Sequence, residues 1–308
     1  MLSLLRNLTL AVALLTLHVA FAQSLTFRQV LDRPDRPQPD HKIAYGPGPN
    51  QYGELWLPKT TTKAPLPVVV LIHGGCWLSE LPGPELLAFL SDGLRNKDVA
   101  VWSITYRRVS GGNDNPMGGG YPATFNDIAS GVDYLRKIAP QYNLDLKRIV
   151  TSGHSAGGHL AAWAAARAKL PADSPLRSAD PLPIKGMVGI AGLVDLAYAA
   201  SATAFACGDK TVEKLIDSDK RGKKEAFRDT SPIELLPLGS NIRQVLVSGT
   251  YDGIVPPVHG WRYANRAKEK GEAVEVVNLD NAGHFELISP WTAPGRALVD
   301  KIVEVVKQ

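Results

Sequence analysis

One segment of this chain, residues 148–163, limits what the chain can fold into more than any other segment. It reads R-I-V-T-S-G-H-S-A-G-G-H-L-A-A-W: a β-branched run typical of a strand, a G-H-S-A-G turn and an alanine-rich run typical of a helix. Gly153 and Gly157 lack side chains, so the strand and the helix can approach closely enough for so tight a turn. We therefore predict a strained backbone at Ser155, with its hydroxyl raised beside the positive end of a helix.

The pattern G-x-S-x-G occurs by chance in many chains and is by itself only a hypothesis of a nucleophile. Here the flanking strand and helix patterns supply the structural context that the motif requires. We therefore predict that Ser155 is the catalytic nucleophile. His154 and His159 flank it too closely to fold back onto its hydroxyl, so we expect them to serve local packing.

Strand and helix patterns alternate along most of the remaining chain. Strands are predicted at residues 67–72, 99–104, 185–190, 243–248 and 273–279, and helices at 85–94, 124–138, 259–270 and 294–306. This alternation predicts an α/β fold, with a mostly parallel central sheet and helices on both faces. The length and the 44% apolar content of the full chain suffice for one domain over residues 23–308.

Three stretches depart from the alternation. Residues 23–65 are proline-rich and polar, so we expect an extended β segment that lies over the sheet. Residues 194–240 form a cap-like excursion of the kind that overhangs a site at the carboxyl edge of a sheet. Residues 111–120 are glycine-rich but lack the Gly-Lys-Ser of a phosphate cradle, which predicts a flexible loop and no nucleotide site.

The first 22 residues have the pattern of a signal peptide. Arg6 precedes an apolar run over residues 8–21, and A-F-A precedes Gln23, so we predict cleavage after Ala22 and export to the periplasm or the exterior. The alternative is a retained membrane anchor, but the run is short for a bilayer. The formal net charge of the full chain is only +4, which argues against a nucleic-acid partner.

A base and an orienting acid are expected at the ends of later strands. A serine hydroxyl needs a nearby imidazole to take its proton, and a carboxylate that fixes the tautomer of that imidazole. Asp252 follows the strand predicted at 243–248, and His284 follows the strand predicted at 273–279. The chain order Ser155, Asp252, His284 is the order expected for a strand–turn–helix nucleophile.

Other residues could take these two roles. Asp252 precedes a glycine, so it could simply be a turn residue. His259 begins a helix shortly after Asp252 and could serve as the base. We expect Asp280 to be a turn residue at the end of its strand, and Glu286 to help orient the loop of His284.

The anion formed in acyl transfer needs backbone donors, and the sequence His73-Gly74-Gly75-Cys76-Trp77 follows the first buried strand. We assign an oxyanion hole to the N–H groups of Gly75, Cys76 and Ala156, and we expect His73 to brace this loop. Cys76 and Cys207 are the two cysteines of the sequence. An exported chain could join them in a disulfide, if their Cα atoms come within reach.

Taken together, these motifs resemble the α/β-hydrolase superfamily, in the esterase branch of hormone-sensitive lipase, bacterial feruloyl-esterase-like proteins and kynurenine formamidases. The resemblance covers about residues 50–308. The carrying motifs are H-G-G-C-W at 73–77, Y-R-R at 106–108, Y-P-A at 121–123 with Asp127, G-H-S-A-G-G-H-L-A at 153–161, Y-D-G-I-V-P at 251–256 and G-H-F at 283–285.

The resemblance implies a serine hydrolase that cleaves small to medium carboxylic esters through an acyl-enzyme, with no metal or organic cofactor. Two departures disfavour a lidded long-chain lipase: Cys76 replaces the usual fourth residue of H-G-G-G, and residues 23–60 lack the pattern of a helical cap. An amidase or arylformamidase with the same triad is one alternative. A non-catalytic binding protein on a hydrolase scaffold is another.

Overall fold

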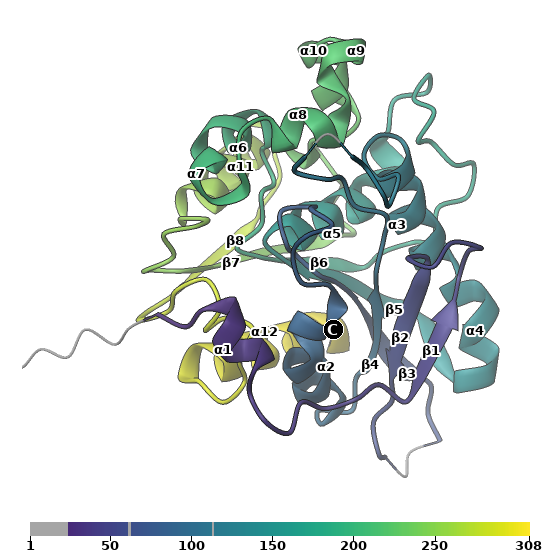
Figure 1. Ribbon diagram of the computed structural model, residues 1–308. Helices are drawn as coiled ribbons and strands as arrows, with labels where there is room; N and C mark the ends of the chain where they lie inside the picture. Colours follow the sequence, from purple (N-terminus) through teal and green to yellow (C-terminus); the bar gives the residue numbers. More distant parts are fainter. Residues whose placement is uncertain (1–23, 61–62, 113) are drawn as a thin grey trace, which may run out of the picture.

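The computed structural model describes residues 24–60, 63–112 and 114–308. Within these residues, one sheet contains eight strands in the order β1-β2-β4-β3-β5-β6-β7-β8 (Figure 1). Strands β3 to β8 run parallel to one another, and β2 is antiparallel to both of its neighbours, β1 and β4. The strands are His41–Ala44 (β1), Tyr52–Trp56 (β2), Leu66–Ile72 (β3), Ala100–Ile104 (β4), Leu144–His154 (β5), Gly186–Ile190 (β6), Arg243–Gly249 (β7) and Glu275–Leu279 (β8).

Helices cover both faces of the sheet. Helices α2 (Ala88–Arg95) and α12 (Ala293–Lys307) pack on one face, and α3 (Ala123–Asp133), α5 (Ala156–Ala166) and α11 (Val258–Glu269) lie on the other (Figure 1). The central strands β3 and β6 are buried along their whole length, as expected for parallel strands between two helical layers. The predicted α/β fold with a mostly parallel sheet is therefore confirmed.

The excursion predicted at 194–240 consists of short helices. They form a group at the top of Figure 1 and are tied to α5: Trp163 Nε1 donates to Asp229 O at 2.8 Å, and a ring nitrogen of His159 pairs with Thr230 O at 2.8 Å. The helices are Leu196–Ala202 (α6), Ala204–Cys207 (α7), Thr211–Ile216 (α8), Ser218–Arg221 (α9), Lys223–Arg228 (α10) and the 3₁₀ helix Pro232–Leu235 (η3).

The expectation for residues 23–65 was wrong in two respects. Residues Phe27–Leu31 form a helix, α1, whose start is fixed by a reciprocal capping box: the side chains of Thr26 and Gln29 each accept from the backbone N–H of the other. Strands β1 and β2 do not lie over the sheet; they extend it, with β2 paired antiparallel to β4.

The single helix predicted over residues 124–138 is divided at Tyr134 into α3 and α4 (Leu135–Tyr142). The indole N–H of Trp102 donates to Gly131 O at 2.8 Å. In an unbroken helix that carbonyl would accept from the N–H of residue 135. A tertiary hydrogen bond thus competes with the helical one at the break.

The predicted signal peptide, residues 1–22, lies outside the described residues. No helix in the described ranges is long and apolar enough to cross a membrane.

We expect Gly157→Ala to prevent folding or to cost at least about 3 kcal/mol of stability. A Cβ at this position would lie 2.0 Å from Ile72 O and 2.5 Å from His73 O, both backbone atoms. Soluble yield and denaturant unfolding of the purified protein would measure the loss. Gly253→Ala is the matched control, since a Cβ there meets nothing within 4 Å; equal stability of the two variants would contradict the prediction.

Candidate active site

Ser155 lies between β5 and α5, at the carboxyl edge of the sheet. Its φ of 59° and ψ of −122° are a strained combination for a residue with a side chain, as predicted. The N–H of Ser155 donates to Ile190 O at 2.8 Å, which ties the turn to the next strand. A Cβ at Gly153 would lie 2.2 Å from Gly157 O, so the predicted need for both small residues is confirmed.

Asp252 and His284 meet at the same edge, beyond the ends of β7 and β8. His284 Nδ1 donates to Asp252 Oδ2 at 2.7 Å. The other carboxylate oxygen, Oδ1, accepts from the N–H groups of Ile254 and Val255, each at 2.8 Å. These bonds fix the orientation of the carboxylate, and the carboxylate in turn fixes the proton of His284 on Nδ1.

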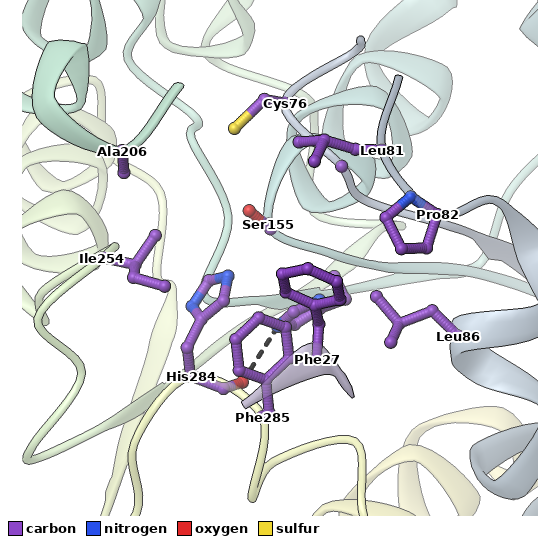
Figure 2. A pocket seen from close by; sticks show the side chains of 12 residues that line it. Phe27, Cys76, Leu81, Pro82, Leu86, Ser155, Ala206, Ile254, His284 and Phe285 are labelled. Atoms are coloured by element: carbon purple, nitrogen blue, oxygen red, sulfur yellow. Dashed lines mark hydrogen bonds between the residues drawn. The ribbon is translucent and has the colours of Figure 1, made fainter. Parts of the chain in front are cut away.

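Ser155 and His284 line one cavity of about 180 Å³, and Figure 2 shows both side chains at its centre. No hydrogen bond joins the Ser155 hydroxyl to the His284 ring among the described residues. Bonds of this kind are commonly long in free enzymes and tighten when substrate binds. The three predicted residues thus converge on one rim, with Asp252 behind His284.

His154 contacts His284 and holds its backbone, although we expected His154 to serve only local packing. The two rings lie 4.3 Å apart between centroids, and His154 Nε2 lies 3.0 Å from His284 O. Burial and the nearby His284 lower the pKa of His154 well below its ordinary value. A neutral His154 therefore donates from Nε2 to that carbonyl and holds the backbone of His284.

The predicted anion pocket has an unusual backbone. Gly75, Cys76 and Trp77 have φ values of 89°, 51° and 57° in succession. Within the described residues, the N–H groups of Gly75 and Cys76 and that of Ala156, the first residue of α5, donate to no protein acceptor. Gly75 and Cys76 also line the cavity beside Ser155. Donors without partners around a nucleophile are what an oxyanion requires.

His73 braces this loop, as expected. It is fully buried and stacks on Tyr106, with 4.6 Å between the ring centroids. The hydroxyl of Tyr106 donates to His73 O at 3.0 Å, and Nδ1 of His73 donates to Gly74 O at 2.9 Å. Burial, reinforced by Arg108, lowers the pKa of His73 to about 3, so this ring is neutral at physiological pH.

A disulfide joins Cys76 to Cys207, with 5.4 Å between their Cα atoms. It connects the H-G-G-C-W loop to α7 in the excursion. Ala206, the neighbour of Cys207, lines the cavity. The disulfide that the sequence could not decide is therefore present, and it holds the excursion beside Ser155.

The competing candidates lie elsewhere. His259 is buried against Tyr198, with 4.9 Å between the rings, and it does not line the cavity. Asp280 is an exposed turn residue. Glu286 does orient the loop of His284, because its Oε2 accepts from Gly283 N at 3.0 Å. No group of three metal-ligating side chains occurs in the described ranges.

Comparisons with known proteins agree with this architecture. The model of the BD-FAE family matches residues 54–265. The chain is 24% identical to Esterase LipC of Mycobacterium tuberculosis over 250 residues, which are 80% of this chain and 60% of LipC. It is 25% identical to Probable carboxylesterase 7 of Arabidopsis thaliana over 86% of each chain. The chain thus spans less than two thirds of the length of LipC.

Among solved structures, an inhibited esterase B from Lactobacillus rhamnosis superposes with a TM-score of 0.72 at 18% identity, over 89% of each chain. Likeness at this identity establishes the fold alone. Together with the strand order, it confirms the α/β-hydrolase fold that the motifs implied.

Proposed function

Because the chain belongs to the BD-FAE family, we propose that it is a serine hydrolase of the carboxylesterase type, acting on small to medium carboxylic esters. The proposal depends on the meeting of three side chains at one cavity. Ser155, with a φ of 59° on the turn before α5, lines the same cavity as His284. Nδ1 of His284 lies 2.7 Å from Asp252 Oδ2. The esterase relatives support the reaction class.

In the first half of the reaction, His284 Nε2 takes the proton of the Ser155 hydroxyl, and the oxygen attacks the ester carbonyl carbon. The carbonyl oxygen becomes an anion that accepts hydrogen bonds from the N–H groups of Gly75, Cys76 and Ala156. The bond to the alcohol oxygen then breaks, and His284 gives its proton to that oxygen. The acyl group remains on Ser155.

In the second half, His284 Nε2 takes a proton from a water molecule, and the hydroxide attacks the acyl carbon. The same three N–H groups donate hydrogen bonds to the new anion. Its collapse breaks the bond to Ser155 Oγ, which regains the proton from His284, and the carboxylic acid leaves. Asp252 keeps the imidazole oriented and stabilises its positive charge in both halves.

The proposal is tested by initial rates on p-nitrophenyl acetate and on a matched N-formyl aryl amine, together with labelling by a fluorophosphonate probe. We expect labelling, and a faster reaction with the ester. A faster reaction with the formyl amine would replace the esterase by an amidase or formamidase. Absence of both labelling and turnover would favour a non-catalytic binding protein.

Reduction of the disulfide should impair this enzyme. A bridge between residues 131 positions apart is expected to contribute about 3–5 kcal/mol, so reductant should lower Tm by several degrees. It should also lower the ester turnover severalfold, because Cys76 carries one of the proposed oxyanion donors. Cys207→Ser is the control and should show no further effect of reductant. Unchanged behaviour, with two titratable thiols in the native protein, would contradict this prediction.

The proposed setting of the reaction is outside the cytoplasm, after cleavage behind Ala22. The A-F-A pattern before Gln23 and the disulfide support export to an oxidising compartment. N-terminal sequencing of the mature protein from a cell fractionation should begin at Gln23. An intact N-terminus in the membrane fraction would indicate a retained anchor.

A further inference from the structure

The N-terminal helix α1 reaches the cavity beside Ser155. Phe27, its first residue, is a lining side chain, and its ring lies 6.3 Å from that of Phe285. Phe285 in turn packs edge-on against His284, with 5.1 Å between the rings. A residue near the start of the chain is therefore part of the wall around the nucleophile.

Glu286 holds this N-terminal segment against the loop of His284. Its Oε1 accepts from Leu25 N at 2.5 Å, and its Oε2 accepts from Gly283 N at 3.0 Å. Val30, on the inner side of α1, is 1% exposed. The position of Phe27 is thus fixed at two points, by the buried Val30 and by the carboxylate that also orients the catalytic loop.

The lining side chains divide into two sides around Ser155. Figure 2 shows His284 and Ile254 on one side, and Leu81, Pro82, Leu86 and Phe27 on the other. His284 must give its proton to the leaving oxygen. In the proposed reaction the leaving group would therefore lie on the side of His284, and the acyl group would extend toward the side of Phe27.

The acyl side is small and apolar. The whole cavity measures about 180 Å³, and none of its lining residues in the described ranges is Lys, Arg, Asp or Glu. A cavity of about 150 Å³ is filled by a molecule of the size of benzene. An acyl chain of a few methylene groups would therefore fit within these walls, and no Lys or Arg among the lining residues would compensate a charged acyl chain.

We infer that Phe27 is a specificity-determining residue: it closes the acyl side of the site and restricts the substrate to esters of short, uncharged, apolar acids. This inference rests on the proposed ester hydrolysis and adds the acyl class to it. It also assigns a function to the N-terminal helix α1.

The test is a series of p-nitrophenyl esters from acetate through butyrate and octanoate to decanoate, measured as kcat/KM. Wild type should prefer the short acyl groups. Phe27→Ala should raise the ratio of decanoate to butyrate by about tenfold or more, since one methylene of misfit already changes rates by about that factor. Phe27→Trp should act in the opposite direction and favour acetate over butyrate.

Phe89→Ala is the matched control. Like Phe27, Phe89 is a half-buried phenylalanine that packs against another aromatic ring, that of Trp291 at 4.9 Å between centroids, but it does not line the cavity. It should leave the acyl profile unchanged. Thermal unfolding of each variant shows whether it folds; if Phe27→Ala does not fold, the Phe27→Trp profile decides.

The possible failures are distinct. Wild-type protein that hydrolyses none of the esters would overturn the proposed function. Wild-type protein that hydrolyses them, while folded Phe27 variants keep its acyl profile, would overturn the inference about Phe27 alone. A wild-type preference for decanoate would overturn the inference as well.

Discussion

Ser155→Ala should lower kcat for p-nitrophenyl acetate by about 10⁵- to 10⁶-fold, the loss found when a serine nucleophile is removed from a complete triad. Alanine offers no oxygen for the attack on the carbonyl, so no acyl-enzyme can form. The fold should be unaffected, because the Ser155 hydroxyl makes no hydrogen bond in the described residues and alanine has nearly the same shape. Stopped assays of p-nitrophenolate release and thermal unfolding measure the two quantities.

Ser152→Ala provides the control for this variant. Ser152 lies on the same strand, and its hydroxyl donates to Val188 O at 2.9 Å, so its loss should cost about 1 kcal/mol of stability and leave turnover nearly intact. Ser155→Ala should therefore abolish turnover without loss of stability, whereas Ser152→Ala should lower stability without loss of turnover. Near-wild-type activity of Ser155→Ala would show that the nucleophile is another residue.

Much of the arrangement around Ser155 was predictable because it is local or set by topology. The turn requires the two glycines of G-H-S-A-G, because a Cβ at either position would lie only 2.0 to 2.2 Å from a backbone oxygen. Asp252 and His284 lie far apart in sequence, yet each follows a parallel strand. Residues in such positions must meet at the carboxyl edge of the sheet, so strand patterns alone were enough to bring them together.

The parts that escaped prediction depend on contacts between distant segments. The T-x-x-Q capping box at residues 26–29 is visible in the sequence and indicates the start of α1, but the prolines that follow it, from Pro34 onward, favoured an extended segment. That α1 then docks beside Phe285, through Glu286, follows from no local pattern. The break at Tyr134 has a similar cause, since it depends on a hydrogen bond from Trp102, a residue on another element.

The roles assigned to Ser155, Asp252, His284 and the three oxyanion donors remain predictions. Contacts from other residues support the positions of His284 and of the loop that contains Cys76. His154 contacts the ring and the carbonyl of His284, and the disulfide holds the loop of Cys76. Both the base and the anion pocket are thus supported by partners outside the motifs that identified them, which is what a preorganised site requires.

Asp252→Asn should lower kcat by about 10³- to 10⁴-fold with little loss of stability. The two carboxylate oxygens have different partners: Oδ1 accepts from the N–H groups of Ile254 and Val255, and Oδ2 accepts from His284 Nδ1. Asparagine has one oxygen, and it will keep the two backbone donors. Its NH₂ group must then face Nδ1.

An NH₂ group in that position can donate only to an unprotonated Nδ1, so the proton of a neutral His284 moves to Nε2. That tautomer cannot take the proton of the Ser155 hydroxyl, and the rate falls although every atom keeps its place. Asp280→Asn is the matched control: it removes the same charge from the exposed turn before His284 and should change kcat less than twofold. If Asp252→Asn retained kcat within about fivefold of wild type, Asp252 would not be the orienting acid, since loss of the correct tautomer costs far more.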